Sequence, residues 1–432
     1  MVTKHMKKIL YGKQTHQALE NFPFSIHRVH KKLIYAIVMI KKAAAQANEK
    51  AGKLSSAKTH VIVKACDEIL KGKYDDQFVT PALQGGAGTS INMNVNEVIA
   101  ALSKTHPNDD VNMSQSTNDV NPAALKITSI YLIMELLRNL DQLVITFEKK
   151  ARQYKHVLKL GRTHWQDAVP TTFGEEMESY AAVLKSDRKR ITEILAYFYD
   201  LGLGGTAIGN SVNAPKQYVT EVYARLKKMT GINLKPSFNF MSQTSSQSDF
   251  CHLSAVMTIL CLDLSKIAGD IRFMASGPKG GIGEIKLQPL QPGSSIMPGK
   301  VNPVIPEVIN QLYYLVNGKN ETIHEAAHDS NLELGNMFPI LADSLISILQ
   351  LTSTGIQLFN EKCIKTMKVD EERCRELLEK STAYATPLTL VLGYDIVSNI
   401  VKEALEKNKT IREVILEKKL VTEKEFDTII KH

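Results

Sequence analysis

The chain has 432 residues, of which 44% are hydrophobic and 23% charged, the balance of an ordinary globular protein. This composition excludes a disordered chain, a collagen-like repeat and a disulfide mini-scaffold, and the length leaves room for more than one hydrophobic core. The five cysteines are scattered without a CxxC pair, which favours a reducing compartment over a disulfide framework or a metal cluster. The net charge of +8 is spread along the chain, so it does not indicate nucleic-acid binding by itself.

The longest apolar run near the N-terminus, Leu33 to Ile40, lies between lysine pairs. It is too short to span a bilayer, and it lacks the small-residue cleavage site of a signal peptide. We therefore expect a soluble protein of the cytoplasm that does not bind membranes.

Apolar residues recur at helical spacing over several stretches near 30 residues, whereas the usual globular helix has about 11–12. The predicted helices cover residues 123–152, 172–200, 248–276, a stretch that begins near 306, and 337–359. Strand signals are weak throughout. The expected fold is mostly α, with a central long-helix bundle. The apolar face of the third helix is too wide for one bundle to cover, which predicts association with further copies; its residues are Leu253, Met257, Leu260, Leu264, Ile267 and Ile271.

Three regions interrupt this helical pattern. Residues 85–90 read Gly-Gly-Ala-Gly-Thr-Ser, and a turn at His106–Asp109 precedes Ser-Gln-Ser-Thr-Asn-Asp at 114–119. The third region, 277–303, holds six glycines and five prolines. An irregular segment of that length within a helical protein is typically functional or disordered, and its mixture of apolar and polar residues favours function.

The side chains best suited to binding or catalysis are concentrated in one segment, Gly293-Ser-Ser-Ile-Met-Pro-Gly-Lys-Val-Asn-Pro303. It offers two hydroxyls, one cation and one amide on a backbone that glycine allows to turn sharply, and successive N–H groups in such a loop can hold an anion. A serine can act as a base there if those donors stabilise its alkoxide. On composition alone, a plain surface loop explains the segment equally well.

This segment resembles the signature loop of the fumarase/aspartase superfamily, and the resemblance covers most of the chain. The blocks at 85–90 and 114–119 match further family motifs in the expected order, as does Gly-Arg-Thr-His-Trp-Gln-Asp-Ala-Val-Pro at 161–170. One such block would be weak evidence, but four in order make the plain-loop interpretation improbable.

The resemblance implies a role for each matching residue. Ser294 would be the general base that removes a proton beside a carboxylate, giving an enediolate (aci-carboxylate) dianion that the Ser294–Ser295 backbone helps to stabilise. Lys300 and Asn302 would bind one carboxylate of a small dicarboxylate substrate. His164 would be the active-site histidine and Glu307 its partner, although a lone histidine is more often structural. The residues expected to hold the other carboxylate and the leaving group are Thr89, Ser116, Thr117 and Asn118.

Members of this superfamily differ mainly in the leaving group that they release. The motif at 166–170 favours the fumarase and aspartase branches over lyases that release larger amines. Residues 20–25, 85–90, 303–311 and 412–417 favour aspartase, whereas His164 and the His106–Asp109 turn favour fumarase. The expected reaction is reversible deamination of L-aspartate to fumarate and ammonia, with hydration of fumarate to L-malate as the alternative. A non-catalytic structural homologue is a third possibility, which intact Ser294, Lys300 and His164 argue against.

By resemblance, no organic cofactor or metal is expected, and the protein should be a homotetramer whose active sites are shared between subunits. The expected domains are an N-terminal helical domain (1–119), a central long-helix domain (120–364) that carries the loop 277–303, and a small C-terminal helical domain (365–432). Two departures from the family are a shorter connection before His106 and Gly209-Asn-Ser211 in place of Gly-Thr-Gly. The His106–Asp109 turn resembles a second anion site of fumarases, but a simple turn explains it equally well.

Overall fold

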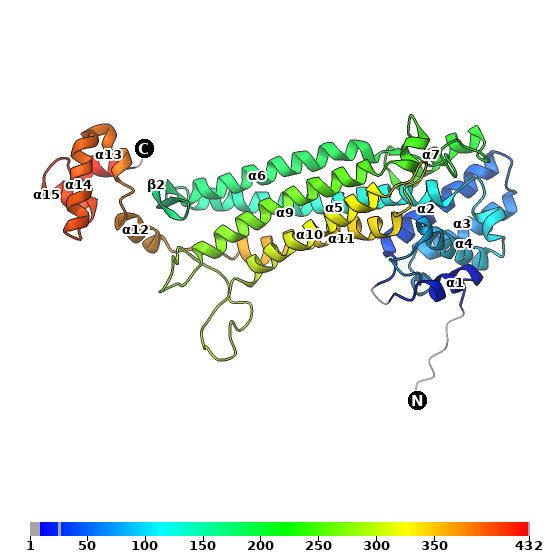
Figure 1. Ribbon diagram of the computed structural model, residues 1–432, viewed down its shortest axis with the longest axis horizontal. Helices are drawn as coiled ribbons and strands as arrows, with labels where there is room; N and C mark the ends of the chain where they lie inside the picture. The colour runs from blue at the N-terminus through cyan, green and yellow to red at the C-terminus, as the bar shows by residue number, and fades with distance from the viewer. Residues whose placement is uncertain (1–8, 25–26, 431–432) are drawn as a thin grey trace. The chain divides into compact units, whose positions relative to one another are not determined.

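The computed structural model describes residues 9–24 and 27–430, and α-helices dominate these residues (Figure 1). They form two compact units. Unit 1 contains the chain up to Leu137, Asp187–Cys261 and Tyr314–Ser353. Unit 2 contains Arg138–Ser186, Leu262–Tyr313 and the chain from Thr354 onward. Because each unit draws on separate stretches of chain, the division into three consecutive domains stays a prediction.

The helices of the described residues are α1 (Lys13–Asn21), α2 (Lys31–Lys50), α3 (Ser56–Leu70), α4 (Thr89–Ser103), α5 (Thr117–Gln153), α6 (Phe173–Ile194), α7 (Lys216–Thr230), α8 (Phe240–Ser245), α9 (Ser248–Met274), α10 (Val304–His328), α11 (Phe338–Phe359), α12 (Glu371–Glu379), α13 (Ala385–Leu392), α14 (Tyr394–Glu406), α15 (Ile411–Glu417) and α16 (Glu423–Ile429). Short helical turns are η1 (Asp75–Gln77), η2 (Gly86–Gly88), η3 (Pro107–Val111), η4 (Leu195–Phe198) and η5 (Asn360–Ile364). The strands form three two-stranded pairs: β1 (Leu158–Thr163) with β2 (Gln166–Thr172), β3 (Asp200–Leu201) with β4 (Lys235–Pro236), and β5 (Ile285–Lys286) with β6 (Lys368–Val369).

The long helices confirm the predicted fold class. The predicted stretches at 172, 248, 306 and 337 correspond to α6, α9, α10 and α11, each beginning within about two residues of its expected start. The first stretch begins earlier than predicted, at Thr117, because polar Asn118 and Asp119 occupy its first turn. Glu307 lies in the first turn of α10, as predicted.

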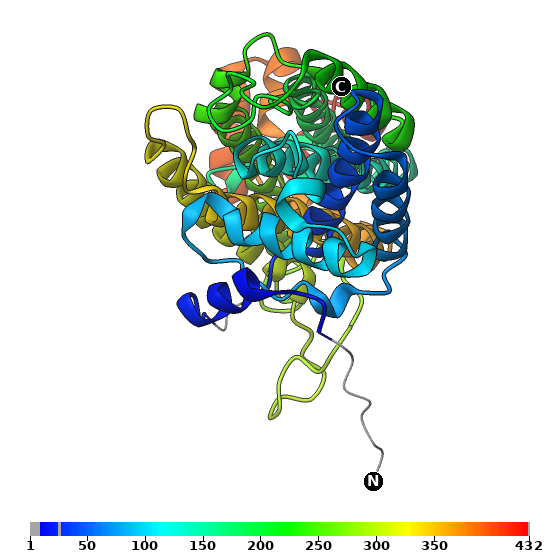
Figure 2. The ribbon, with the colours of Figure 1, turned by 90° about the vertical axis from the view of Figure 1, so that its right-hand side faces the viewer.

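In unit 1, helix α2 packs against α3, α4 and α7 (Figure 2). The apolar run Leu33–Ile40 lies within this helix, and most of its side chains are buried. Alanines continue the buried face toward the C-terminal end of α2, where small side chains let neighbouring helices approach closely.

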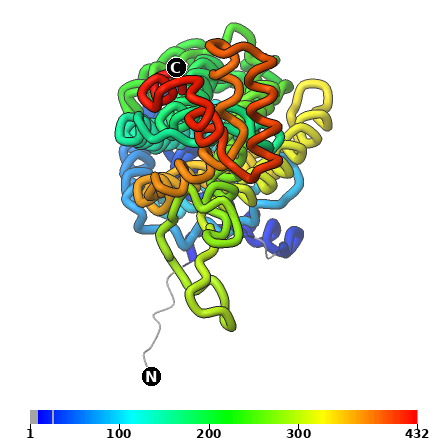
Figure 3. Tube along the Cα trace, turned by 90° about the vertical axis from the view of Figure 1, so that its left-hand side faces the viewer, coloured from blue at the N-terminus to red at the C-terminus, as the bar shows by residue number. Residues whose placement is uncertain are grey.

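In unit 2, the C-terminal helices α13–α16 surround a small core of their own (Figure 3). Tyr384 and Phe426 meet edge to face in this core, with ring centroids 5.3 Å apart. Leu160 of β1 belongs to the same buried cluster, so the β1–β2 hairpin is anchored on the C-terminal helices.

The residues that suggested association through the third helix are covered by the chain itself. All six, from Leu253 to Ile271, are at most 1% exposed. The prediction that further copies of the chain are needed to cover them is therefore wrong. A single chain nevertheless leaves other apolar side chains exposed on the long helices: Tyr131, Met134 and Ile145 on α5, Ile259 and Leu262 on α9, and Val308, Tyr314 and Leu315 on α10.

Three helical segments have the length and hydropathy of a membrane span: Thr117–Gln153, Ser248–Met274 and Phe338–Ile364. Their most apolar stretches are 72%, 50% and 67% buried inside the protein, respectively. The apolar residues of these segments are therefore largely accounted for by packing within the chain.

Candidate active site

The glycine-rich turn before α4 has an unusual backbone that fixes where Thr89 stands. Gly86, Ala87 and Gly88 have φ values of 74°, 56° and 82°, which lie in the left-handed region. A Cβ atom on Gly88 would lie 2.6 Å from Asn121 Nδ2, which donates to the carbonyl of Gly88 at 3.0 Å. Only glycine fits there, and the turn leaves Thr89 exposed at the start of α4.

The motif at 114–119 is organised by Asp119, which is 1% exposed. One carboxylate oxygen accepts from the N–H of Ser116 at 2.9 Å, and the other accepts from the N–H groups of Gly204 (2.9 Å) and Thr206 (3.1 Å). Burial raises the pKa of this carboxyl, while the three backbone donors act in the opposite direction. Asp119 thus ties the start of α5 to the loop after β3.

The two helix starts lie together in unit 1. Asn121 stands one turn into α5 and donates to the backbone just before α4, so the N-terminal ends of both helices meet. Unpaired N–H groups at helix N-termini favour anions. Unit 1 therefore brings Thr89 toward the Ser116–Asn118 segment in a setting suited to a carboxylate.

Further hydrogen bonds fix the Ser116–Asn118 segment. Asn92 donates to Thr117 Oγ1 at 3.3 Å, and Asn118 donates to the carbonyl of Ala207 at 2.8 Å. The sequence motifs gave no role to Asn92, Asp119 or Asn121. Asp119 had one signal, its place in the 114–119 motif, whereas the burial of Asn92 and Asn121 is set by the fold.

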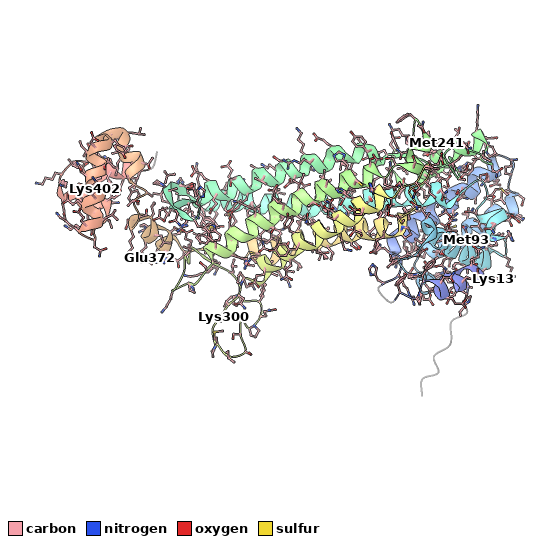
Figure 4. The ribbon with its side chains drawn as sticks, viewed as in Figure 1. Lys13, Met93, Met241, Lys300, Glu372 and Lys402 are labelled. Atoms are coloured by element: carbon pink, nitrogen blue, oxygen red, sulfur yellow. The ribbon has the colours of Figure 1, made fainter. Side chains whose placement is uncertain are left out.

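The signature loop in unit 2 is closed at its neck. The N–H of Gly293 donates to the carbonyl of Lys300 at 3.1 Å, and Asn302 Nδ2 donates to the carbonyl of Gly293 at 2.8 Å. A Cβ atom on Gly293 would lie 2.2 Å from the Lys300 oxygen, so only glycine fits at the neck. Figure 4 shows Lys300 on this loop, away from the helices α9 and α10 that the loop connects.

Within the loop, the Ser294 hydroxyl oxygen accepts two hydrogen bonds. The N–H groups of Ile296 and Met297 both donate to Ser294 Oγ at 3.2 Å. Such local turns are common for serine, but the same two donors would also stabilise negative charge on this oxygen. Ser294 Oγ is therefore the acceptor for two backbone donors of its own loop.

His164 lies at the tip of the β1–β2 hairpin, where Thr163 pairs with Gln166. His164 and Trp165 have φ values of 55° and 62°, the backbone of a two-residue turn that normally contains Asn-Gly. Trp165 stacks on Phe273 with ring centroids 5.5 Å apart, yet it is 76% exposed. The tip of this hairpin is therefore both strained and exposed.

Two site residues of unit 2 that were expected to be partners are not bonded within one chain. Among the described residues, the side chains of His164 and Glu307 form no hydrogen bond or ion pair with each other. Ser295 and Lys300 are exposed and Ser294 is half-buried.

The first leg of the signature loop is anchored by a buried carboxylate. Glu284, which is fully buried, forms ion pairs with Lys159 (3.0 Å) and Arg162 (2.8 Å), both of β1. Burial alone would lower the pKa of Lys159, but Glu176 and Glu284 raise it above its ordinary value. On the other side, Arg373 of α12 donates to the carbonyls of Ile282 (2.9 Å) and Gly281 (3.1 Å).

The His106–Asp109 turn has a local explanation. His106 Nδ1 accepts from the N–H of Asp109 at 3.0 Å, and the N–H of His106 donates to Asp110 at 2.9 Å. These bonds stabilise η3 without a ligand. In residues 9–24 and 27–430, no group of three or more His, Cys, Asp or Glu side chains is arranged to hold a metal ion.

The comparisons with known proteins agree with the motifs. The family described as "Lyase" matches residues 3–318, and "Fumarase C C-terminus" matches residues 385–432. The aspartate ammonia-lyase of Bacillus subtilis is 40% identical over 434 residues, which cover 98% of this chain and 91% of the relative. The aspartate ammonia-lyase of Helicobacter pylori is 37% identical over 438 residues, covering 98% and 94%, respectively.

Solved structures are similar as well. The fumarate lyase:delta crystallin from Brucella melitensis bound to cobalt is 41% identical with a TM-score of 0.93, covering 98% of this chain and 95% of that one. The class II fumarase from Schistosoma mansoni is 32% identical with a TM-score of 0.92, over the same shares of the two chains. These matches extend along nearly the whole chain and include enzymes with different leaving groups. The chain is an enzyme of the lyase family and belongs to the fumarase/aspartase superfamily.

Proposed function

We propose that this protein catalyses the reversible deamination of L-aspartate to fumarate and ammonia, with Ser294 as the general base. The observation that carries the proposal is the pair of backbone N–H groups that point at Ser294 Oγ. The names of the curated relatives, all aspartate ammonia-lyases among those compared, support aspartate as the substrate.

The chemistry requires strong stabilisation of negative charge. Removing a proton from the carbon beside a carboxylate places a second charge on a group that is already an anion, so the intermediate is an aci-carboxylate dianion. Ser294 takes that proton, and Lys300 and Asn302 bind the oxygens on which the charge develops, with the Ser294–Ser295 backbone as further donors. Donors that are already oriented lower this barrier most, because they pay no reorganisation when the charge appears.

The other carboxylate and the amino group of the substrate bind to four uncharged residues, which form a neutral cradle: Thr89, Ser116, Thr117 and Asn118. Neutral donors orient a dianionic substrate without binding it so tightly that turnover suffers. Two helix N-termini in the same place add positive potential. His164 serves this site as the remaining proton-transfer group, with Glu307 of another subunit as its partner, and no organic cofactor takes part.

The active enzyme is a homotetramer in which each site draws residues from different subunits. The exposed apolar side chains on α5, α9 and α10 support this arrangement, since contiguous exposed apolar surface marks interaction sites. The hairpin tip at His164 and the loop at Lys300 are exposed in a single chain, and both would be covered by partner chains in the tetramer. We place the enzyme in the cytoplasm, without a nucleic-acid or membrane partner.

Hydration of fumarate to L-malate is the second candidate, because the class II fumarase from Schistosoma mansoni has a very similar fold. The two activities are separated by giving the purified protein L-aspartate and L-malate in parallel and following fumarate by ultraviolet absorbance. The proposal predicts fumarate from L-aspartate; fumarate from L-malate alone would identify a fumarase. If neither substrate reacts while the oligomer is intact, a non-catalytic homologue becomes the better account.

A further inference from the structure

A fully buried lysine lies behind the proposed cradle in unit 1. Lys41 of α2 is 0% exposed, and its Nζ donates to Asn112 Oδ1 at 2.7 Å. Burying an ammonium group is costly unless it is well paired, and a methionine of similar length would fill the same space without that cost. The charge at this position therefore calls for an explanation beyond packing.

Asn112, which accepts the hydrogen bond from Lys41, forms hydrogen bonds with several other residues. Besides Lys41, Asn112 Oδ1 accepts from Asn92 Nδ2 (3.1 Å) and Asn96 Nδ2 (3.2 Å), both of α4. Asn112 Nδ2 in turn donates to the carbonyl of Gln115 at 3.3 Å, immediately before the cradle residues. The position of the 112–115 backbone is thereby fixed to α2 and α4.

The same network reaches a proposed substrate-binding side chain. Asn92, which donates to Asn112, also donates to Thr117 Oγ1 at 3.3 Å. A path of three hydrogen bonds therefore joins the Lys41 ammonium to the Thr117 hydroxyl. Lys41, Asn92 and Thr117 are buried and Asn112 is partly buried, so these bonds are stronger and more sensitive to charge than they would be in water.

The charges that face Lys41 are few. Asp119 of α5 is the nearby acid, and its attraction raises the pKa of Lys41, while burial is the larger effect and lowers that pKa to about 7. Cys66 of α3 also faces Lys41, but burial raises its pKa to about 12, so this thiol is neutral. On α7, burial raises the pKa of Tyr218 well above its ordinary value. From α4, the uncharged Asn92 and Asn96 bond to Asn112, whereas Glu97, the acid of this helix, bonds to Gly12 and Thr15.

We propose that Lys41 is a positioning residue for the substrate-binding segment 114–118, holding it through Asn112 and Asn92 and placing a positive charge behind its neutral donors. The inference rests on the proposed function, since it assigns substrate anions to that segment. The protonated amine favours binding of a dicarboxylate, and substrate binding favours the protonated amine in return. Deprotonation of Lys41 then weakens substrate binding.

The test compares three variants in the full-length protein: Lys41→Met, Asn112→Asp and the control Lys42→Met. Lys42 is the next residue of the same helix, but it is partly exposed and pairs with Asp67. Initial rates from pH 6 to pH 9.5 give kcat and KM for whichever of L-aspartate and L-malate the wild type converts. Circular dichroism melts establish that each variant is folded.

The proposal predicts that the wild-type kcat/KM falls as pH rises through the ionisation of Lys41. In Lys41→Met this alkaline limb of the kcat/KM profile is absent. At pH 6.5 the KM of this variant is about tenfold higher than that of the wild type, while kcat changes less. In Asn112→Asp the new carboxylate beside Nζ raises the Lys41 pKa, so the limb moves to higher pH by about one unit or more. Lys42→Met keeps the wild-type profile.

Two results would overturn the inference. If folded Lys41→Met has the wild-type KM and pH profile, Lys41 is only a packing residue; if Asn112→Asp leaves the limb in place, that ionisation belongs to another group. Failure of the proposed function looks different. A wild type that converts L-malate alone refutes deamination and leaves the comparison of variants valid, whereas a wild type that converts neither substrate refutes both.

Discussion

At the scale of single residues, the proposed base and its surroundings are defined by backbone geometry more than by side-chain neighbours. Ser294 Oγ is held by two N–H groups of its own loop, and no histidine is needed to explain how it could carry negative charge. Lys300 closes the same loop through its carbonyl, which leaves its ammonium free to bind substrate. In the proposed mechanism, one short segment thus supplies both the base and the cation.

Replacing the loop lysine tests this assignment. Lys300→Met should lower kcat/KM by about 10²-fold or more, because the formal positive charge opposite the developing dianion is lost. Folding should be unchanged, since the Lys300 side chain is exposed. Lys279→Met, a second exposed lysine of the same connection, is the matched control and should retain wild-type kinetics.

The backbone of His164 leads to a second prediction at this scale. Asparagine tolerates the left-handed region better than histidine, so His164→Asn should leave the free energy of unfolding unchanged or raise it by up to about 1 kcal/mol. Activity should nevertheless fall by about tenfold or more, because the imidazole is lost. Urea unfolding and steady-state rates measure the two effects; a large loss of stability would show that His164 is structural.

At the scale of elements, the loop 277–303 is an irregular segment with a rigid first leg. Glu284 joins it to β1, and Arg373 joins it to α12, so the end of the loop nearest α9 is held on two sides. Ser294 and Lys300 lie beyond this anchored leg, in the exposed part of the loop.

The anchor can be tested through stability. Glu284→Gln removes a buried negative charge and leaves Arg162 without its buried partner, which should cost about 3 kcal/mol of unfolding free energy. Glu361→Gln breaks the exposed pair with Lys365 and should cost less than about 0.5 kcal/mol. Equal stability of the two variants in urea would contradict a structural role for the buried carboxylate.

The elements also show what the sequence could predict. The long helices follow from their apolar spacing alone, because that pattern is local and extends over many turns. The β1–β2 hairpin was missed, since its turn is His-Trp in place of Asn-Gly and its strands carry exposed polar residues. Likewise, nothing in the sequence distinguishes Lys41 or Glu284 from exposed polar residues, and only the fold shows that both are buried, Lys41 against Asn112 and Glu284 against Lys159 and Arg162.

At the scale of the whole molecule, the proposed site residues are divided between the two units. Thr89 and Ser116–Asn118 belong to unit 1, whereas His164, Ser294 and Lys300 belong to unit 2. In the proposed tetramer, each site is completed by residues of other subunits. Light scattering after size-exclusion chromatography should accordingly give four times the mass of the chain.

Mixed oligomers test the sharing of sites. Ser294→Ala and Asn118→Ala should each be inactive, but tetramers refolded from an equal mixture should regain about a quarter of wild-type activity, because some sites then receive both intact residues. Recovery requires that the two residues of one site come from different chains. No recovery in verified mixed tetramers would show that each chain supplies its own complete site.

The most direct test of the central claim is the rate of fumarate formation from L-aspartate by wild type and by Ser294→Ala, followed by ultraviolet absorbance. The exposed Ser186→Ala serves as the control for serine removal. The account predicts fumarate from the wild type and the control, and a rate at least about 10³-fold lower from Ser294→Ala with the oligomer intact. Wild-type rates in folded Ser294→Ala would contradict the assignment of Ser294 as the base.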